Sequence, residues 1–163
     1  MSKLNAEIQE IIKKQGVFPV ATAAPDGTPN VVPMTFVKAL DEESILVVDN
    51  FMEKTRKNLE SNPAMAICIW DLEGGKKSFQ IKGKTTIVTS GKIFDEAKAW
   101  VAEKMPALSP KAAVVLKVEK IYNCTPGPNQ DTHSALLAGE GFYCHGYYNS
   151  IVAGQHQVNN YNT

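Results

Sequence analysis

Short apolar segments separated by turn residues fill most of the first 121 residues, and they limit what this chain can fold into. Residues 17–24 and 29–40 flank Pro25-Asp26-Gly27-Thr28, in which Pro presets φ, Asp bonds locally and Gly accepts a positive φ. This pattern predicts a β-hairpin. Further strands are predicted at residues 45–48, 64–70, 78–89 and 112–121. Because turns join most of these strands, we expect an antiparallel sheet of about six strands that closes into a small barrel and removes its edges.

Two residues predict local irregularities in these strands. Pro33 cannot donate a ladder hydrogen bond, so segment 29–40 is expected to be interrupted there or to lie on a sheet edge. Gly83 predicts a bulge or bend within segment 78–89. The nearly continuous apolar run 64–70 indicates a central strand, in which Cys68 is expected to pack as a small hydrophobic residue.

Apolar residues recur at helical spacing in two other places. Near the N-terminus such a stripe begins at Leu4, with Ser2 or Asn5 available as a cap and Gly16 as an end. A second stripe runs from Phe94 to Met105, where the following proline ends it. The expected fold class is therefore mainly β with a few short helices.

The segment after strand 45–48 turns through short polar residues and becomes basic, with Lys54, Arg56 and Lys57 around Thr55. Asn62-Pro63 is expected to end it, since a residue that precedes proline avoids the helical region. A helix that begins here leaves backbone N–H groups unpaired beside a cation and a hydroxyl, which is a sound place to hold a phosphate. The alternative is a solvated helix with ordinary surface lysines.

The overall composition excludes several functional classes. The chain has 163 residues, which suits one domain with a sizeable core, and its 17 basic residues equal its 17 acidic ones. Such a balance gives no indication of a nucleic-acid or membrane partner, and no apolar run is long enough to span a bilayer. Three cysteines make no disulfide framework and fit a reducing cytoplasm.

Charge is unevenly distributed along the chain. All 17 basic residues lie at or before Lys120, and after Cys124 the only charged side chains are Asp131 and Glu140. We therefore divide the chain into a domain at residues 1–128 and a C-terminal extension at residues 129–163. The extension contains potential zinc or iron ligands whose spacing matches no finger pattern, so no metal is assigned to them. These ligands are His133, Cys144, His145 and His156.

Several short motifs follow one another in a recognisable order. They are Val20-Ala21-Thr22, Asp26-Gly27-Thr28-Pro29, Val32-Pro33-Met34, Val48-Asp49-Asn50, Lys54-Thr55-Arg56, Asn58-Leu59, Asn62-Pro63, 78–84, 118–122 and Thr125-Pro126-Gly127. Their order and spacing resemble the split-barrel flavin proteins, a group that includes the pyridoxamine 5′-phosphate oxidases and the small FMN-binding proteins of anaerobes. The resemblance covers roughly residues 6–128, and it implies a six-stranded antiparallel split β-barrel.

The resemblance also implies a homodimer that holds an FMN at each end of its interface. The family's phosphate contacts correspond to Lys54 and Thr55, and a partner subunit would contribute Ser78 or Gln80. The flavin ring would face two short stretches of chain. These comprise Asn30, Val31, Val32 and Pro33 on one strand, and the backbone of Val47, Val48 and Asp49 on another. The valines supply an apolar slot, and Lys54 supplies cationic help at the phosphate.

The chain also departs from the pyridoxamine 5′-phosphate oxidases. It has a single arginine, Arg56, and its extension has no basic residue, so a dianionic vitamin substrate is hard to accommodate. We therefore predict a flavin-dependent oxidoreductase or electron-transfer protein that meets a small-molecule electron donor or acceptor, with no catalytic residue assigned. The alternative is a non-catalytic protein that stores or senses flavin. A haem role, also known among split barrels, would need a histidine ligand, which the core sequence lacks.

Overall fold

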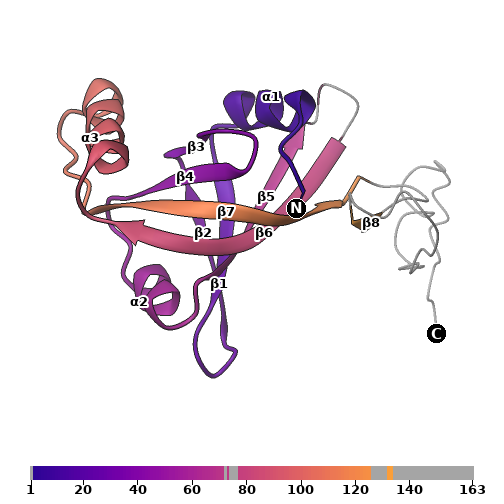
Figure 1. Ribbon diagram of the computed structural model, residues 1–163, viewed down its shortest axis with the longest axis horizontal. Coiled ribbons are helices and arrows are strands. Elements are labelled where there is room, and N and C mark those ends of the chain that lie inside the picture. The colour runs from indigo at the N-terminus through magenta and orange to yellow at the C-terminus, as the bar shows by residue number, and fades with distance from the viewer. Residues whose placement is uncertain (1, 72, 74–76, 126–131, 134–163) are drawn as a thin grey trace, which may run out of the picture.

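An antiparallel sheet with three helices packed around it forms the body of the computed structural model, which describes residues 2–71, 73, 77–125 and 132–133 (Figure 1). The described helices are α1 (Ala6–Lys14), α2 (Lys54–Ser61) and α3 (Lys92–Lys104). The described strands are β1 (Phe18–Ala23), β2 (Pro29–Met34), β3 (Val37–Ala39), β4 (Ser44–Asp49), β5 (Ala64–Asp71), β6 (Lys77–Val88), β7 (Ala112–Asn123) and β8 (Thr132–His133).

The strands are arranged in the order β2-β1-β5-β6-β7-β4-β3, with β8 paired to β7 off this path. Every pairing is antiparallel, and the sheet curls into a half-barrel. The mainly β antiparallel class is therefore confirmed. The path has seven strands where six were expected, because segment 29–40 divides into β2 and β3 at Thr35-Phe36.

Both predicted irregularities are confirmed. Pro33 lies in β2, the strand at one end of the described sheet path, opposite Pro19 of β1. The pairing of β6 with β7 shifts register between Lys82 and Gly83. A Cβ at Gly83 would lie 1.9 Å from the carbonyl oxygen of Lys117, so the close approach of the two backbones requires glycine there.

Strand β4 is buried on both faces, and this divides the apolar interior into two clusters. Ile45 and Val47 point into the main core, which α1 covers, whereas Leu46 and Val48 face a smaller cluster beneath α3. Strand β5, by contrast, alternates between buried and half-buried residues, and Cys68 is only half-buried. Partial burial raises the pKa of its thiol.

The start of α1 and the end of α2 lie where the sequence predicted. Of the two cap candidates, Asn5 is the N-cap of α1, and its side chain accepts a hydrogen bond from Ile8 N at 2.9 Å. Helix α2 ends at Ser61, directly before Asn62-Pro63 as expected. In the part of the chain that the structure describes, no helix is both long and apolar enough to cross a membrane.

Candidate flavin site at the start of helix α2

A buried carboxylate fixes the loop that connects β4 to α2. Asp49 is fully buried, and its Oδ1 accepts a hydrogen bond from Met52 N at 2.9 Å. Its Oδ2 accepts a hydrogen bond from Arg56 Nη1 at 2.6 Å, and Arg56 Nε reaches Glu60 Oε1 at 3.1 Å. The carboxylates of Asp49 and Glu60 raise the pKa of Arg56. Arg56 therefore serves to hold the loop, and its charge is already balanced within the protein.

This fixed loop borders a cavity of about 510 Å³, a size that accommodates a cofactor. The end of β2, the segment before β3, the end of β4 and the start of α2 form its walls. Its lining consists of Val32, Pro33, Met34, Thr35, Phe36, Val48, Asn50, Phe51, Met52, Glu53, Lys54 and Thr55. Most of these side chains are apolar, so the cavity suits a largely apolar ring system with a few polar contacts.

A small polar network holds the Thr55 hydroxyl at the cavity wall. Asn30 Nδ2 donates to Thr55 Oγ1 at 3.1 Å and to Thr22 Oγ1 at 3.2 Å, and Asn58 Nδ2 donates to Thr22 Oγ1 at 3.0 Å. Because Thr55 Oγ1 accepts from Asn30, its own proton is left to donate to a group in the cavity. Thr55 itself is 3% exposed, so the hydroxyl is held within the fold.

The start of α2 is arranged to receive an anion. Glu53 occupies the N-cap position, and its side chain makes no capping hydrogen bond to the helix. Lys54 is the first helical residue and lines the cavity together with Thr55. Unpaired N–H groups at a helix start, a lysine and a hydroxyl are the donors that phosphate binding uses.

One buried acceptor in the cavity lacks a donor. Asn50 Oδ1 is shielded from solvent and has no hydrogen-bond partner among the described residues. A buried acceptor left unsatisfied costs about 1–3 kcal/mol, so such an atom in a cavity wall favours a ligand that carries an N–H or O–H donor.

The structure places the predicted site residues in several different settings. Five of them line the cavity: Val32, Pro33, Val48, Lys54 and Thr55. Asn30 lies behind Thr55, Asp49 is in the buried ion pair and Val47 points into the main core, while Val31 is 64% exposed.

Ser78 and Gln80 lie on β6, outside the lining of this cavity. Ser78 N donates to Thr125 Oγ1 at 3.0 Å, and Gln80 pairs with Cys68 and Tyr122 in the sheet. That these residues complete the site of a partner subunit stays a prediction. In the C-terminal extension, Cys144, His145 and His156 lie outside the described residues, and His133 is placed by its backbone pairing with Tyr122.

Sequence reasoning missed several lining residues. Met34, Thr35 and Phe36 follow the segment of β2 that was assigned to the site, Asn50 follows the segment of β4, and Met52 lies in the loop before α2. The sequence could have indicated these residues, because β2 and β4 both end at the cavity and the residues that follow each strand form its wall. The sequence could not predict that the side-chain oxygen of Asn50 lacks a hydrogen-bond donor, since this depends on which residues surround it in the fold.

The elements that form this cavity all lie within residues 4–125, the part of the chain that matches the family model described as pyridoxamine 5′-phosphate oxidase. The chain belongs to this family. An uncharacterized protein of Methanocaldococcus jannaschii is 37% identical over 129 residues, which cover 78% of this chain and 85% of that protein.

Solved structures support the same fold. HupZ of Group A Streptococcus shares 30% identity and a TM-score of 0.68, covering 77% of this chain and 97% of its own. An FMN-binding protein of Syntrophomonas wolfei shares 16% identity and a TM-score of 0.63, covering 71% of this chain and 82% of its own. HutZ, the heme storage protein of Vibrio cholerae, shares 20% identity and a TM-score of 0.57, covering 74% and 94%. The last two likenesses show the fold alone.

Proposed function

We propose that the protein binds FMN in the cavity at the start of α2 and acts as a flavin-dependent oxidoreductase or electron-transfer protein. The observation that carries this proposal is the combination of a phosphate-type donor set with the orphaned oxygen of Asn50 in one apolar cavity. Lys54 and Thr55 would hold the phosphate, and Val32, Pro33 and Val48 would contact the ring. When bound, FMN supplies the hydride and electron chemistry, and the protein binds and orients it.

The orphaned acceptor favours a flavin over a haem. The oxidised flavin ring carries an N–H group on its pyrimidine portion, which Asn50 Oδ1 would satisfy. A metal-loaded haem has no ring N–H to offer, and no histidine lines this cavity among the described residues. The single phosphate-type site at Lys54 and Thr55 also favours FMN over a dinucleotide.

Oxidation of a phosphorylated vitamin is a poorer fit. Such a substrate would need a second anion site, and arginine is the residue best suited to bidentate hydrogen bonding with a phosphate. The single arginine of the chain is engaged by Asp49 and Glu60. We therefore favour a small electron donor or acceptor as the reaction partner, and storage or sensing of flavin is the alternative.

We also propose that the active form is a homodimer in which the cavity lies at the subunit boundary. Phe51 lines the cavity and is 75% exposed, and Val31, which precedes the lining residue Val32 in β2, is 64% exposed. Large exposed apolar side chains around one cavity favour coverage by another protein surface. Sedimentation of the flavin-loaded protein at micromolar concentration should give a dimeric mass, and a monomeric mass with flavin still bound would contradict the proposal.

A reducing compartment, the cytoplasm, fits the described cysteines. Cys68 takes part in no disulfide within the described part of the chain. Disulfides persist mainly in oxidising compartments, so a thiol at this position fits a reducing environment.

The visible spectrum of the purified protein tests flavin binding. We expect the two-banded absorbance of an oxidised flavin, and release of one FMN per chain on denaturation. A Soret band in place of the flavin bands would assign the cavity to haem and overturn the proposal. Reduction of the bound flavin by NADH or NADPH, followed by turnover with an added acceptor, would separate an oxidoreductase from a storage protein.

A further inference from the structure

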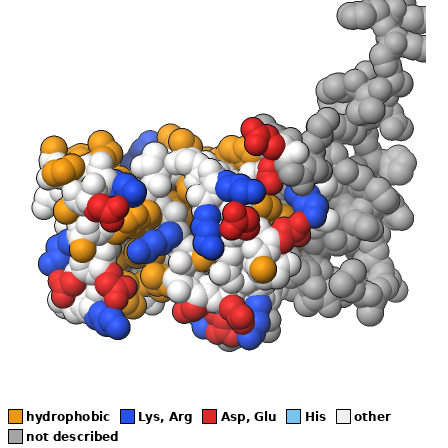
Figure 2. Space-filling view, turned by 90° about the horizontal axis from the view of Figure 1, so that it is seen from above, with side chains coloured by type: hydrophobic (Ala, Val, Ile, Leu, Met, Phe, Trp, Pro, Cys, Tyr) orange, Lys and Arg blue, Asp and Glu red, His pale blue; other side chains and the backbone are white. Residues whose placement is uncertain are grey.

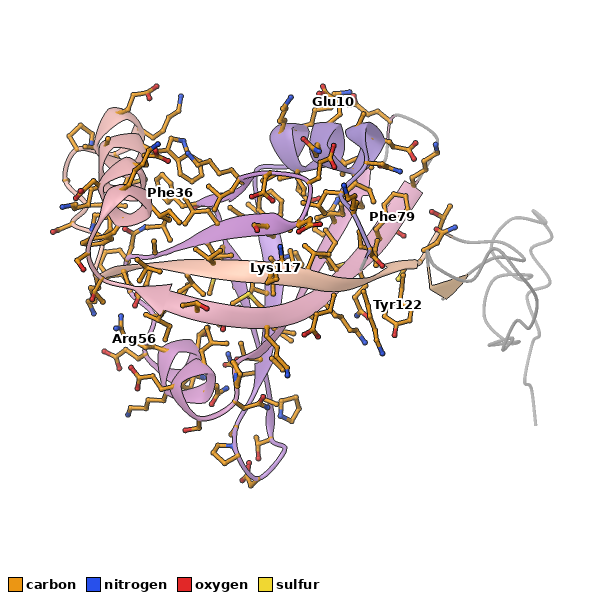
Figure 3. The ribbon with its side chains drawn as sticks, in the orientation of Figure 1. Glu10, Phe36, Arg56, Phe79, Lys117 and Tyr122 are labelled. Carbon is orange, nitrogen blue, oxygen red and sulfur yellow. The ribbon has the colours of Figure 1, made fainter. Side chains whose placement is uncertain are left out.

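A second cavity of about 510 Å³ lies between α1, β3 and α3. Its apolar walls include Ile12, Phe36 and Trp100. Thr35 and Phe36 line both this groove and the proposed flavin cavity, so the two are neighbours that share one short stretch of chain. In the labelled view, Phe36 points from the strands toward α3 (Figure 3). We call this second cavity the lysine groove.

The lysine groove concentrates positive charge in a protein whose formal net charge is zero. Lys13, Lys38 and Lys104 line it, and no carboxylate is among its lining residues. Figure 2 shows several Lys and Arg side chains across the middle of this face, with acidic side chains beside some of them and apolar side chains exposed among them. A cavity that is lined by cationic side chains and has apolar walls attracts an anion with an apolar part.

The three lysines are available to a ligand. Lys13 Nζ lies 3.8 Å from Glu10 Oε2, and Lys104 Nζ lies 3.3 Å from Glu103 Oε1. Both are pairs of exposed side chains, which contribute little to stability and are readily exchanged. Within the described part of the chain Lys38 makes no ion pair, and its Nζ lies 4.6 Å from the centroid of the Trp100 ring.

The Trp100 ring is held in place as an aromatic wall beside these cations. It meets Phe36 edge to face, with ring centroids 5.4 Å apart and an interplanar angle of 82°. Inorganic phosphate would bind the lysines but would make no contact with the aromatic wall. A neutral aromatic molecule would pack on the wall but would leave the lysines without a counter-charge. A planar aromatic ring that bears a negative group satisfies both.

We propose that the lysine groove is a second ligand site, which takes a planar aromatic anion of nucleotide-monophosphate size. Its ring packs against Trp100 and Phe36, and its anionic group binds Lys38 with help from Lys13 and Lys104. The proposal concerns a site outside the flavin cavity and stands whether or not that cavity holds FMN.

Isothermal titration with AMP tests the site directly. The protein is first saturated with FMN, so that the cavity at α2 is occupied or shown to be empty. We expect AMP to bind with one site per chain, and adenosine and inorganic phosphate each to bind about tenfold or more weakly than AMP. Equal binding of AMP and adenosine, or no binding of AMP, would overturn the proposal.

Matched lysine substitutions locate the bound probe. Lys38→Met should weaken AMP binding about tenfold or more, whereas Lys14→Met should leave it unchanged, because Lys14 pairs with the same Glu10 as Lys13 but lies outside the groove. Lys54→Met, at the flavin cavity, should also leave it unchanged. Loss of AMP binding in Lys54→Met alone, or equal affinity in Lys38→Met and the parent protein, would contradict the assignment. Trp100→Leu provides a second variant that should weaken binding without removing a charge.

Discussion

The two cavities on either side of Thr35-Phe36 have the same size but are built differently. The flavin cavity has its donors fixed by buried contacts: Asp49 holds the loop before α2, and Asn30 holds the hydroxyl of Thr55. The lysine groove places its cations on long side chains that are exposed or half-buried at the surface.

This difference bears on affinity and selectivity. Donors fixed before binding lose little conformational freedom when a ligand arrives, so the flavin cavity is suited to tight and selective binding. Lysine side chains at the surface lose more freedom, and their attraction for an anion is screened by salt. We therefore expect a resident cofactor at the first cavity and an exchanging ligand at the second.

The largest expected effect comes from the wall that the cavities share. Phe36 is 8% exposed and packs against Trp100, so Phe36→Ala should lower the free energy of unfolding by about 3–5 kcal/mol. The same substitution should weaken both FMN and AMP, since it opens the wall between the two cavities. Urea unfolding and titration of each ligand measure the two effects.

Phe94→Ala provides the matched control for Phe36→Ala. Phe94 is a partly buried aromatic on α3 that packs against the same apolar cluster but lines neither cavity. It should destabilise the protein less and leave both affinities unchanged. If Phe36→Ala lost only one ligand, the two sites would not share a wall in solution.

Asn50→Leu should change stability and binding in opposite directions. Replacing the orphaned acceptor with an apolar side chain of similar size should raise the stability of the flavin-free protein by roughly 1 kcal/mol, because a buried unsatisfied oxygen is removed. FMN and riboflavin should both bind more weakly, since each offers the same ring N–H, and AMP in the lysine groove should be unaffected. Thermal unfolding and fluorescence titration of flavin measure these changes, and lower stability with unchanged flavin affinity would show that Asn50 has another partner.

Thr55→Val should affect mainly the binding of FMN. The substitution keeps the shape of the buried side chain and removes the hydroxyl, which accepts from Asn30 and is left to donate to the phosphate. We expect FMN to bind about tenfold more weakly and riboflavin to change far less, from the loss of one charge-assisted hydrogen bond. Equal losses for FMN and riboflavin would place Thr55 away from the phosphate.

Backbone constraints made much of the fold predictable from the sequence. Pro33 could not sit in a central ladder and Gly83 indicated a bulge, and both expectations follow from the covalent structure of a single residue. The end of α2 before Asn62-Pro63 was predictable for the same reason, because a residue that precedes proline avoids the helical region.

Contacts between distant residues were not predictable in the same way. Phe36 meets Trp100 only because α3 packs on the outer face of β4 and β7, and no local pattern encodes that approach. The pairing of Asp49 with Arg56 likewise could not be predicted, and it makes the one arginine of the basic segment a structural part of the loop. The cavity residues that the sequence did identify, such as Lys54 and Thr55, lie where a strand, a loop and a helix follow directly in the chain.

The most direct test of the central claim compares FMN with riboflavin in Lys54→Met, using Lys57→Met as control. Lys57 is an exposed lysine on the same helix and lies outside the cavity lining. Loss of a charge-assisted contact worth about 1.5–3 kcal/mol predicts roughly ten- to a hundredfold weaker FMN binding in Lys54→Met. The affinity of this variant for riboflavin should be nearly unchanged, and Lys57→Met should bind both flavins like the parent protein. Equal loss of both flavins, or loss of neither, would contradict a phosphate site at the start of α2.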